Sequence, residues 1–412
     1  MRLRTIAILA VLILASPAAP ASATPYPAEE IQVLLDRMAG AVRAKDKTQF
    51  LAALDDADHD FVARQTAWFE GMSLLPVKDF VLELELLQAP EFTRQRDRDK
   101  YKVPVMVAAV EARFRLDGYD PRPAILDHVF TFVYRTDRWL VATDSGLEDL
   151  GIITDHSLWE FGAIELKKSE HFLFIYHPAQ AAFADELVAA AEASLAAVSQ
   201  AWKPNWNMQI PVFVPSNQTE VTKMIGDIFD VSYFVAFASA SLDRETESGW
   251  ELVGNRVTIN PSRFLAGSQA TRQDIFSHEL VHIATRGASG PFVPTFVEEG
   301  IAQISERRSL NVLNRRIRSG KFDRRLPEDF EFLTGNASDI FNSYQEAFSA
   351  MSFMKQTFGI DKLDAFYQAL GKPRIEPGTS RYHTNLALTQ TLGISLVDFE
   401  SRWANFAASS AR

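Results

Sequence analysis

The sequence contains no cysteine among its 412 residues, and this absence narrows the chemistry open to the protein. Disulfide bonds, thiol catalysis and thiolate metal ligands are excluded, and so is lipid attachment through an N-terminal cysteine. In an oxidising compartment the stability of the chain must then come from its hydrophobic cores and from any metal that it binds.

Positive charge is also scarce. The chain carries 42 Lys and Arg residues against 53 Asp and Glu residues, which gives a formal net charge of −11 at pH 7. Nucleic acid is therefore not an expected partner, because its binding requires a basic surface. The hydrophobic content of 47% and the charged content of 23% are those of a folded chain long enough for two or more domains.

Long apolar runs are confined to the N-terminus. Arg2 and Arg4 precede the apolar stretch Ile6 to Leu14, and the small residues Ala21-Ser22-Ala23 follow. This order predicts a secretory signal peptide over residues 1–23, whose apolar part is too short to span a bilayer. Its removal would take away the two arginines and move the formal charge from −11 to −13. We expect a bacterial exported protein, secreted or periplasmic, with no membrane span after cleavage.

The segment Ser277 to Arg286 reads S-H-E-L-V-H-I-A-T-R. On a helix His278 and His282 lie one turn apart on the same face, so both imidazoles can bind one metal ion. Glu279 projects from the neighbouring position toward a water on that ion. The residues around them are apolar: Ile275, Phe276, Leu280, Val281, Ile283 and Ala284. Buried imidazoles need partners, so this pattern predicts a zinc site rather than two surface histidines.

A second motif, F-V-E-E-G-I-A, follows at residues 296–302. Together the two motifs resemble those of the gluzincin zinc metallopeptidases, and more narrowly the peptidase MA-like family, over roughly Phe172 to Phe406. That family usually has Trp-Leu-x-Glu-Gly-Leu-Ala here, and Phe296 replaces the Trp. The resemblance implies that Glu299, which precedes the glycine, is the third zinc ligand. Glu298 is the rival, but helical neighbours point about 100° apart, so only one of the two can face the ion.

The same resemblance implies a mechanism. Glu279 would act as the general base toward water, and zinc would polarise the peptide carbonyl. Gluzincins usually add a second electrophile, and Tyr344, expected at the start of a helix Tyr344 to Phe358, is the candidate for it. Its alternative role is that of a core tyrosine. Tyr382 and His383 are a second possibility for the electrophile.

Zinc-bound imidazoles usually donate their other ring proton to an acceptor that fixes their orientation. Gln303 lies four residues after Glu299, on the same helix face, and Asp274 lies one turn before His278. We expect one of these two side chains to take that place.

The periodicity divides the mature chain into two parts. The spacing of apolar residues predicts an amphipathic helix over Ala28 to Lys45, and a two-residue alternation from Phe80 opens a set of antiparallel strands. Helices followed by a curved antiparallel sheet give an α+β class, and this order resembles the cone-shaped nuclear-transport-factor-like fold. We expect a signal peptide at 1–23, an accessory domain at 24–150 and a gluzincin-like metallopeptidase domain at 151–412.

In the second part, strands and helices alternate from Phe172, as in the small mixed sheet before the active-site helix of gluzincins, and the chain is largely helical after Ser305. The β-rich segment Asn255 to Asn260 is followed by Pro261. With a proline here, the segment is confined to the edge of a sheet or to the end of a strand. It would either border the cleft, where an extended peptide could pair with it, or form an ordinary edge strand.

The sequence thus predicts a secreted zinc peptidase that acts on peptide or protein substrates, with no other cofactor. The alternative is an exported ligand-binding or regulatory protein whose zinc site is structural or inactive. Glu279 favours the enzyme, because a structural site has no use for a general base.

Overall fold

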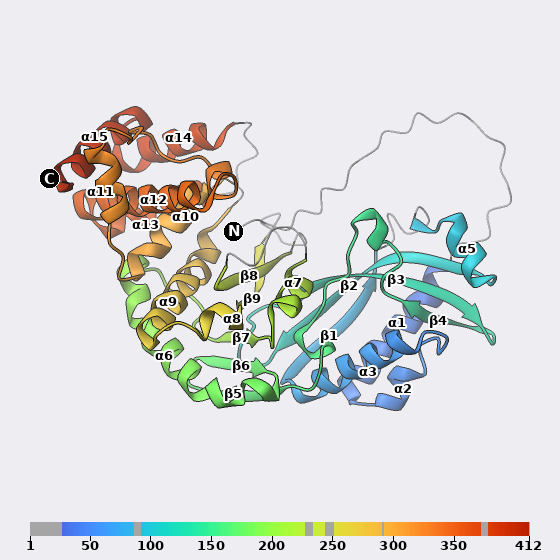
Figure 1. Cartoon of the computed structure of the whole chain (residues 1–412). Coiled ribbons are helices and arrows are strands. Elements are labelled where there is room, and N and C mark those ends of the chain that lie inside the picture. The colour runs from blue at the N-terminus through green and yellow to red at the C-terminus, as the bar shows by residue number, and fades with distance from the viewer. Residues whose placement is uncertain are drawn as a thin grey trace, which may run out of the picture.

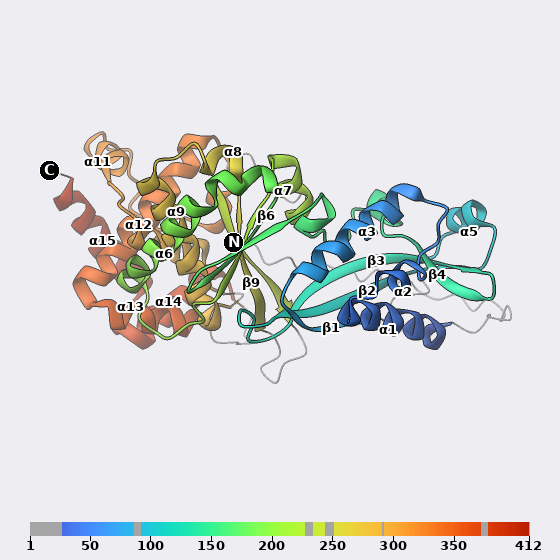
Figure 2. The same ribbon diagram turned by 90° about the horizontal axis from the view of Figure 1, so that it is seen from below.

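The computed structural model describes residues 27–85, 92–226, 234–243, 251–290, 292–371 and 378–411. Two sheets organise it, and they lie side by side with the C-terminal helices beyond the second sheet (Figures 1 and 2). The first sheet is antiparallel and curved, the second is mixed, and the last third of the chain is helical. The predicted α+β class is confirmed. No helix in these ranges is both long and apolar enough to cross a membrane.

The N-terminal half combines helices with a four-stranded sheet in the order β1-β2-β3-β4. The strands are β1 (Val77–Leu84), β2 (Val105–Leu116), β3 (Ala124–Arg135) and β4 (Arg138–Thr143). The helices are α1 (Ala28–Ala44), α2 (Lys47–Leu51), α3 (His59–Leu74) and α5 (Gln95–Tyr101). In α1 the predicted apolar face is buried, because its residues recur every three or four positions and pack on the sheet.

The second sheet has the order β5-β6-β7-β9-β8. Its strands are β5 (Glu165–Lys168), β6 (Phe172–Tyr176), β7 (Ile210–Val214), β8 (Ala236–Asp243) and β9 (Glu251–Ile259). Between them lie η3 (Pro178–Phe183), α6 (Ala184–Ala201) and α7 (Gln218–Ile225), and the short 3-10 helices η1 (Glu148–Leu150) and η2 (Leu158–Glu160) precede β5. The boundary that the sequence predicts near residue 150 falls at η1, between the two sheets.

The rest of the described chain is helical. It comprises α8 (Pro261–Phe264), α9 (Gln269–Thr285), η5 (Arg286–Ala288), α10 (Thr295–Ala302), η6 (Gln303–Ser305), α11 (Asn311–Arg318), η7 (Asp329–Phe332), α12 (Ala337–Phe358), α13 (Ile360–Gly371), α14 (Ser380–Leu392) and α15 (Leu396–Ser410). Helix α9 packs against α6 and against strand β8, and α10 packs against α12.

The structure corrects the expected position of the segment Asn255 to Asn260. The expected edge segment belongs to β9, which lies between β7 and β8, so β8 forms the edge of the sheet. Strand β8 was not predicted, because its run A-F-A-S-A-S-L-D is rich in small residues with little strand propensity. Pro261 does mark the end of a strand, since it is the first residue of α8.

Helix α12 begins at Ala337 and not at Tyr344. Asn336 caps its N-terminus, because the Asn336 side chain accepts hydrogen bonds from the backbone N–H groups of Ser338 and Asp339. Tyr344 therefore lies about two turns inside the helix.

The two halves share hydrophobic packing through β6. Side chains of this strand alternate between the two faces of the sheet. Phe172, Phe174 and Tyr176 belong to the C-terminal core, while Leu173 and Ile175 belong to the core of the N-terminal half. The second sheet thus lies between the N-terminal half on one face and α6 and α9 on the other.

Candidate metal centre

Helix α9 positions both histidines of the predicted motif. Ser268 caps its N-terminus by accepting a hydrogen bond from the Thr271 N–H, and the apolar face of the helix is buried. His278 and His282, four residues apart, direct their Nε2 atoms toward each other at 3.1 Å. Two ring nitrogens at this distance on one helix face form one side of a metal site.

Helix α10 brings the third candidate ligand, Glu299, to the two histidines. One carboxylate oxygen of Glu299 lies 3.2 Å from His278 Nε2, and the other lies 3.7 Å from His282 Nε2. The next residue, Gly300, allows the close approach of α10 to α12, because a Cβ there would lie 2.5 Å from the Ala347 carbonyl oxygen. Close helix packing is therefore one physical reason for the Glu-Gly sequence at this point.

The three side chains fit a four-coordinate ion. Their ligand atoms all lie within 4.8 Å of one another. Zinc bonded at about 2.0 Å holds the ligands of a tetrahedron about 3.3 Å apart, close to the observed separations. Three protein ligands would leave one position open, as in catalytic rather than structural zinc sites.

Electrostatics at this cluster favour an ionised carboxylate. Burial alone would raise the pKa of Glu299, but the imidazoles of His282 and His278 hold it well below its ordinary value. Burial alone would lower the pKa of His278, whereas the carboxylates of Glu306 and Glu299 raise it well above its ordinary value. Glu299 is therefore ionised, which is the form in which a carboxylate binds a metal ion.

Glu298, the rival ligand, points elsewhere. Its carboxylate accepts a hydrogen bond of 3.0 Å from the Ser289 hydroxyl and lies 3.5 Å from the Tyr367 hydroxyl. Of the two adjacent glutamates, the structure brings Glu299 to the histidines, as the family pattern implies.

Glu279 is buried between α9 and the edge strand β8. Its Oε2 accepts a hydrogen bond of 2.7 Å from the Ala238 N–H. The sequence did not predict this partner, which is 41 residues away and belongs to strand β8.

The orienting partner of His278 is Glu306, and the two candidates proposed from the sequence do not have this role. Glu306 Oε1 lies 2.7 Å from His278 Nδ1. Gln303 instead donates to the Tyr344 carbonyl oxygen, and Asp274 pairs with Arg307 at 2.9 Å. Helix α10 gives way to the turn η6 at Gln303, so helical spacing counted from Glu299 no longer applies, and the acceptor is the first residue beyond that turn.

Tyr344 lies in α12, and its ring packs edge-on against Phe332 at 5.2 Å between ring centroids. Burial, reinforced by the carboxylates of Glu299 and Glu279, raises the pKa of Tyr344 well above its ordinary value. The phenol therefore keeps its proton at neutral pH and remains a hydrogen-bond donor close to the cluster.

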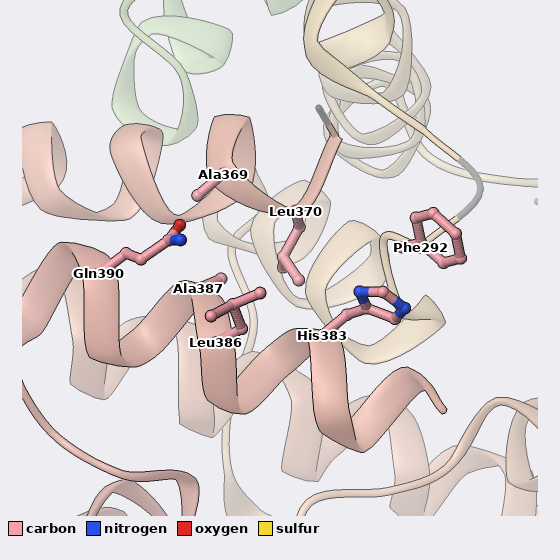
Figure 3. A pocket seen from close by; sticks show the side chains of 7 residues that line it. All are labelled: Phe292, Ala369, Leu370, His383, Leu386, Ala387 and Gln390. Atoms are coloured by element: carbon pink, nitrogen blue, oxygen red, sulfur yellow. The ribbon is translucent and has the colours of Figure 1, made fainter. Parts of the chain in front are cut away.

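The second candidate pair lies elsewhere in the fold. His383 stacks on Phe292, with ring centroids 4.0 Å apart, in a small pocket between α13 and α14 (Figure 3). Tyr382 is exposed. Beyond the effect of burial, the carboxylates of Glu299 and Glu279 raise the pKa of Tyr344, so Tyr344 lies near the cluster, and this proximity favours Tyr344 for the electrophile.

A comparison of the sequence with protein-family models and with curated proteins finds no match. The resemblance to gluzincins therefore depends on the two motifs alone, and the arguments for function come from the geometry above.

Proposed function

We propose that this protein is an exported zinc-dependent peptidase of gluzincin type. The observation that carries the proposal is the convergence of His278 Nε2, His282 Nε2 and the Glu299 carboxylate at the separations of a tetrahedral ion. A buried carboxylate that is not a ligand, Glu279, lies on the same helix. Three protein ligands leave one position of the zinc ion open, and a neighbouring carboxylate can act as a base. This combination is typical of a hydrolytic site, because a structural site needs neither an open position nor a base.

The residues divide the chemistry among them. His278, His282 and Glu299 would hold the zinc, which when bound supplies the positive charge that polarises a peptide carbonyl and makes water acidic near neutral pH. Glu279 takes the proton of the attacking water on its carboxylate. It then releases this proton to the nitrogen of the leaving amine.

Tyr344 is proposed as the second electrophile. Its protonated hydroxyl would donate a hydrogen bond to the substrate carbonyl oxygen as negative charge develops there. The raised pKa supports this role, because an ionised phenolate could not donate.

The proposed substrates are peptides or proteins outside the cytoplasm. Residues 1–23 lie outside the described ranges, and export is inferred from their charge and apolar order. The acidic composition is the reason that nucleic acid is not proposed as a partner.

Turnover of a peptide library tests the proposal. Zinc-loaded protein should cleave peptides, lose this activity with a chelator and regain it when zinc is restored. Glu279→Gln should keep its zinc and lose turnover by several orders of magnitude, because only the base is removed. A wild-type protein that binds zinc but cleaves nothing in the library would favour the alternative of a binding protein with an inactive site. A Glu279→Gln variant that keeps its turnover would instead show that Glu279 is not the base.

A further inference from the structure

Arg286 is a buried cation next to the proposed site that the mechanism does not yet use. It follows α9 directly, and only 5% of its surface is exposed. Its Nη2 donates a hydrogen bond of 2.8 Å to the Ala238 carbonyl oxygen, and its Nε donates one of 3.3 Å to the His282 carbonyl oxygen. Burial lowers the pKa of Arg286 to about 10, so the guanidinium stays charged at neutral pH. Burying a charge has a large free-energy cost unless it is paired or hydrogen-bonded, and these two carbonyl groups provide such bonds.

Ala238 receives contacts at both of its backbone polar groups. Its N–H donates to Glu279 and its C=O accepts from Arg286, and both partners come from α9 or the turn that follows it. Strand β8 is the edge of the sheet and has β9 as its neighbour. The backbone groups of Ala238 that face away from β9 are thus held by the proposed base and by a cation.

Contacts with the N-terminal half also hold the paired strands β8 and β9 in place. The guanidinium of Arg256, in β9, donates to both carboxylate oxygens of Asp120 in a buried, bidentate ion pair. The guanidinium of Arg122 lies 2.8 Å from the carboxylate of Asp243 at the end of β8. Gly254 has a φ of +64° and lies so close to Ala124 that a Cβ would be 2.4 Å away. Strands β8 and β9 are therefore held against the first sheet, and Arg286 binds β8 at Ala238, the residue that contacts Glu279.

We propose that Arg286 is a positioning residue for Glu279, acting through the Ala238 peptide. By holding the carbonyl, the guanidinium sets the distance between β8 and α9. That distance places the Ala238 N–H on one oxygen of Glu279 and fixes the direction of the carboxylate. This inference rests on the proposed function, because positioning of a base affects turnover only if Glu279 is the base.

Arg286→Gln tests the inference, with Arg286→Lys as the conservative variant and Arg272→Gln as a matched control. Arg272, which lies in α9, is also a buried arginine that donates to a backbone carbonyl, that of Leu265 at 2.7 Å, but it forms an ion pair with Glu186. The control therefore loses a similar buried guanidinium without affecting β8.

Three quantities decide the outcome: zinc per chain, kcat with KM on a cleaved peptide, and hydrogen exchange of the backbone amides in residues 236–243. Arg286→Gln should keep one zinc and its KM, lose about 10- to 100-fold in kcat, and exchange the Ala238 amide at least about tenfold faster. Arg286→Lys should recover part of kcat, because an ammonium can also donate to the Ala238 carbonyl. Arg272→Gln should change none of the three.

Wild-type kcat and wild-type exchange at Ala238 in Arg286→Gln would overturn the inference and leave the proposed function intact. If the wild-type protein itself cleaves no peptide, the proposed function fails, and with it the claim that Arg286 positions a base. Amide exchange would then still decide whether Arg286 holds the Ala238 peptide. If Arg286→Gln does not fold, Arg286→Met, whose side chain has no donor, carries the same comparison, and wild-type kcat and exchange there would also overturn the inference.

Discussion

His278 Nδ1 and Glu306 Oε1 lie 2.7 Å apart. The same carboxylate is paired through its other oxygen with Arg308 at 2.5 Å. A carboxylate held in this way accepts the Nδ1 proton of His278, so that Nε2 is turned toward Glu299 and His282, where it can bind a metal ion that displaces its proton. The orientation of the first ligand therefore depends on a residue 28 positions further along the chain.

Glu306→Ala should weaken zinc binding by about 10- to 100-fold, since loss of such an acceptor frees the imidazole to rotate. Competition with a fluorescent zinc chelator measures the affinity. Glu306→Gln, whose amide oxygen can still accept the proton, is the control and should lose less. Equal zinc affinity in wild type and Glu306→Ala would show that His278 is oriented by other contacts.

Glu299→Ala should lose zinc, whereas Glu298→Ala should keep it. The two residues are adjacent, but only the Glu299 carboxylate lies at the histidines. Glu298→Ala instead removes the acceptor of the Ser289 hydroxyl, which should lower the free energy of unfolding by about 1–3 kcal/mol. Elemental analysis after dialysis, with denaturant titration of the same samples, separates the two effects. An exchange of the two results would make Glu298 the ligand.

Tyr344→Phe should keep zinc and KM while kcat falls by about 100-fold, because one hydrogen bond to the developing oxyanion is lost. Tyr382→Phe is the matched control, since Tyr382 was the alternative and is exposed. Steady-state kinetics on one peptide measure both variants. A loss of kcat confined to Tyr382→Phe would reverse the assignment of the electrophile.

Glu346 should make the protein less stable as the pH rises. Burial raises the pKa of Glu346 to about 7 from its ordinary value of 4.5, against the opposing effect of its ion pair with Arg316. Between these two values the unfolded chain releases the proton while the folded chain retains it, so the free energy of unfolding falls as pH increases. The loss is complete above pH 7 and absent below pH 4.5.

Glu346→Gln removes this dependence. Relative to wild type, its free energy of unfolding in excess zinc should rise by roughly 3 kcal/mol between pH 4.5 and pH 7. Glu331→Gln is the control of opposite sign, because a hydrogen bond from Arg325 lowers the pKa of Glu331 and that contribution is lost as pH falls. Parallel stability curves for wild type and Glu346→Gln would show that Glu346 ionises normally in the fold.

Helix spacing was sufficient to predict much of the site. A separation of four residues places His278 and His282 on one face of any helix, and the structure brings Glu299 to them. The α+β class likewise followed from helical and two-residue periodicities, which depend on local sequence.

The features that the sequence did not predict depend on contacts between segments that are distant along the chain. Glu306 reaches His278 because a short turn changes the direction of the chain after α10, and no periodicity encodes that turn. Strand β8 has little strand propensity of its own and forms by pairing with β9, so its bonds to Glu279 and Arg286 could not be predicted. The start of α12 could have been predicted from the sequence, because asparagine is a favourable N-cap residue and Asn336 caps this helix.

The central claim is that one zinc ion is bound by His278, His282 and Glu299. Anomalous diffraction from crystals of the zinc-loaded protein, measured on both sides of the zinc absorption edge, tests it directly. We expect a peak at about 2.0–2.2 Å from the Nε2 atoms of both histidines and from one carboxylate oxygen of Glu299. A zinc peak confined to another acidic group, such as Glu85 with Glu111 and Asp127, or no peak at the histidines, would contradict it.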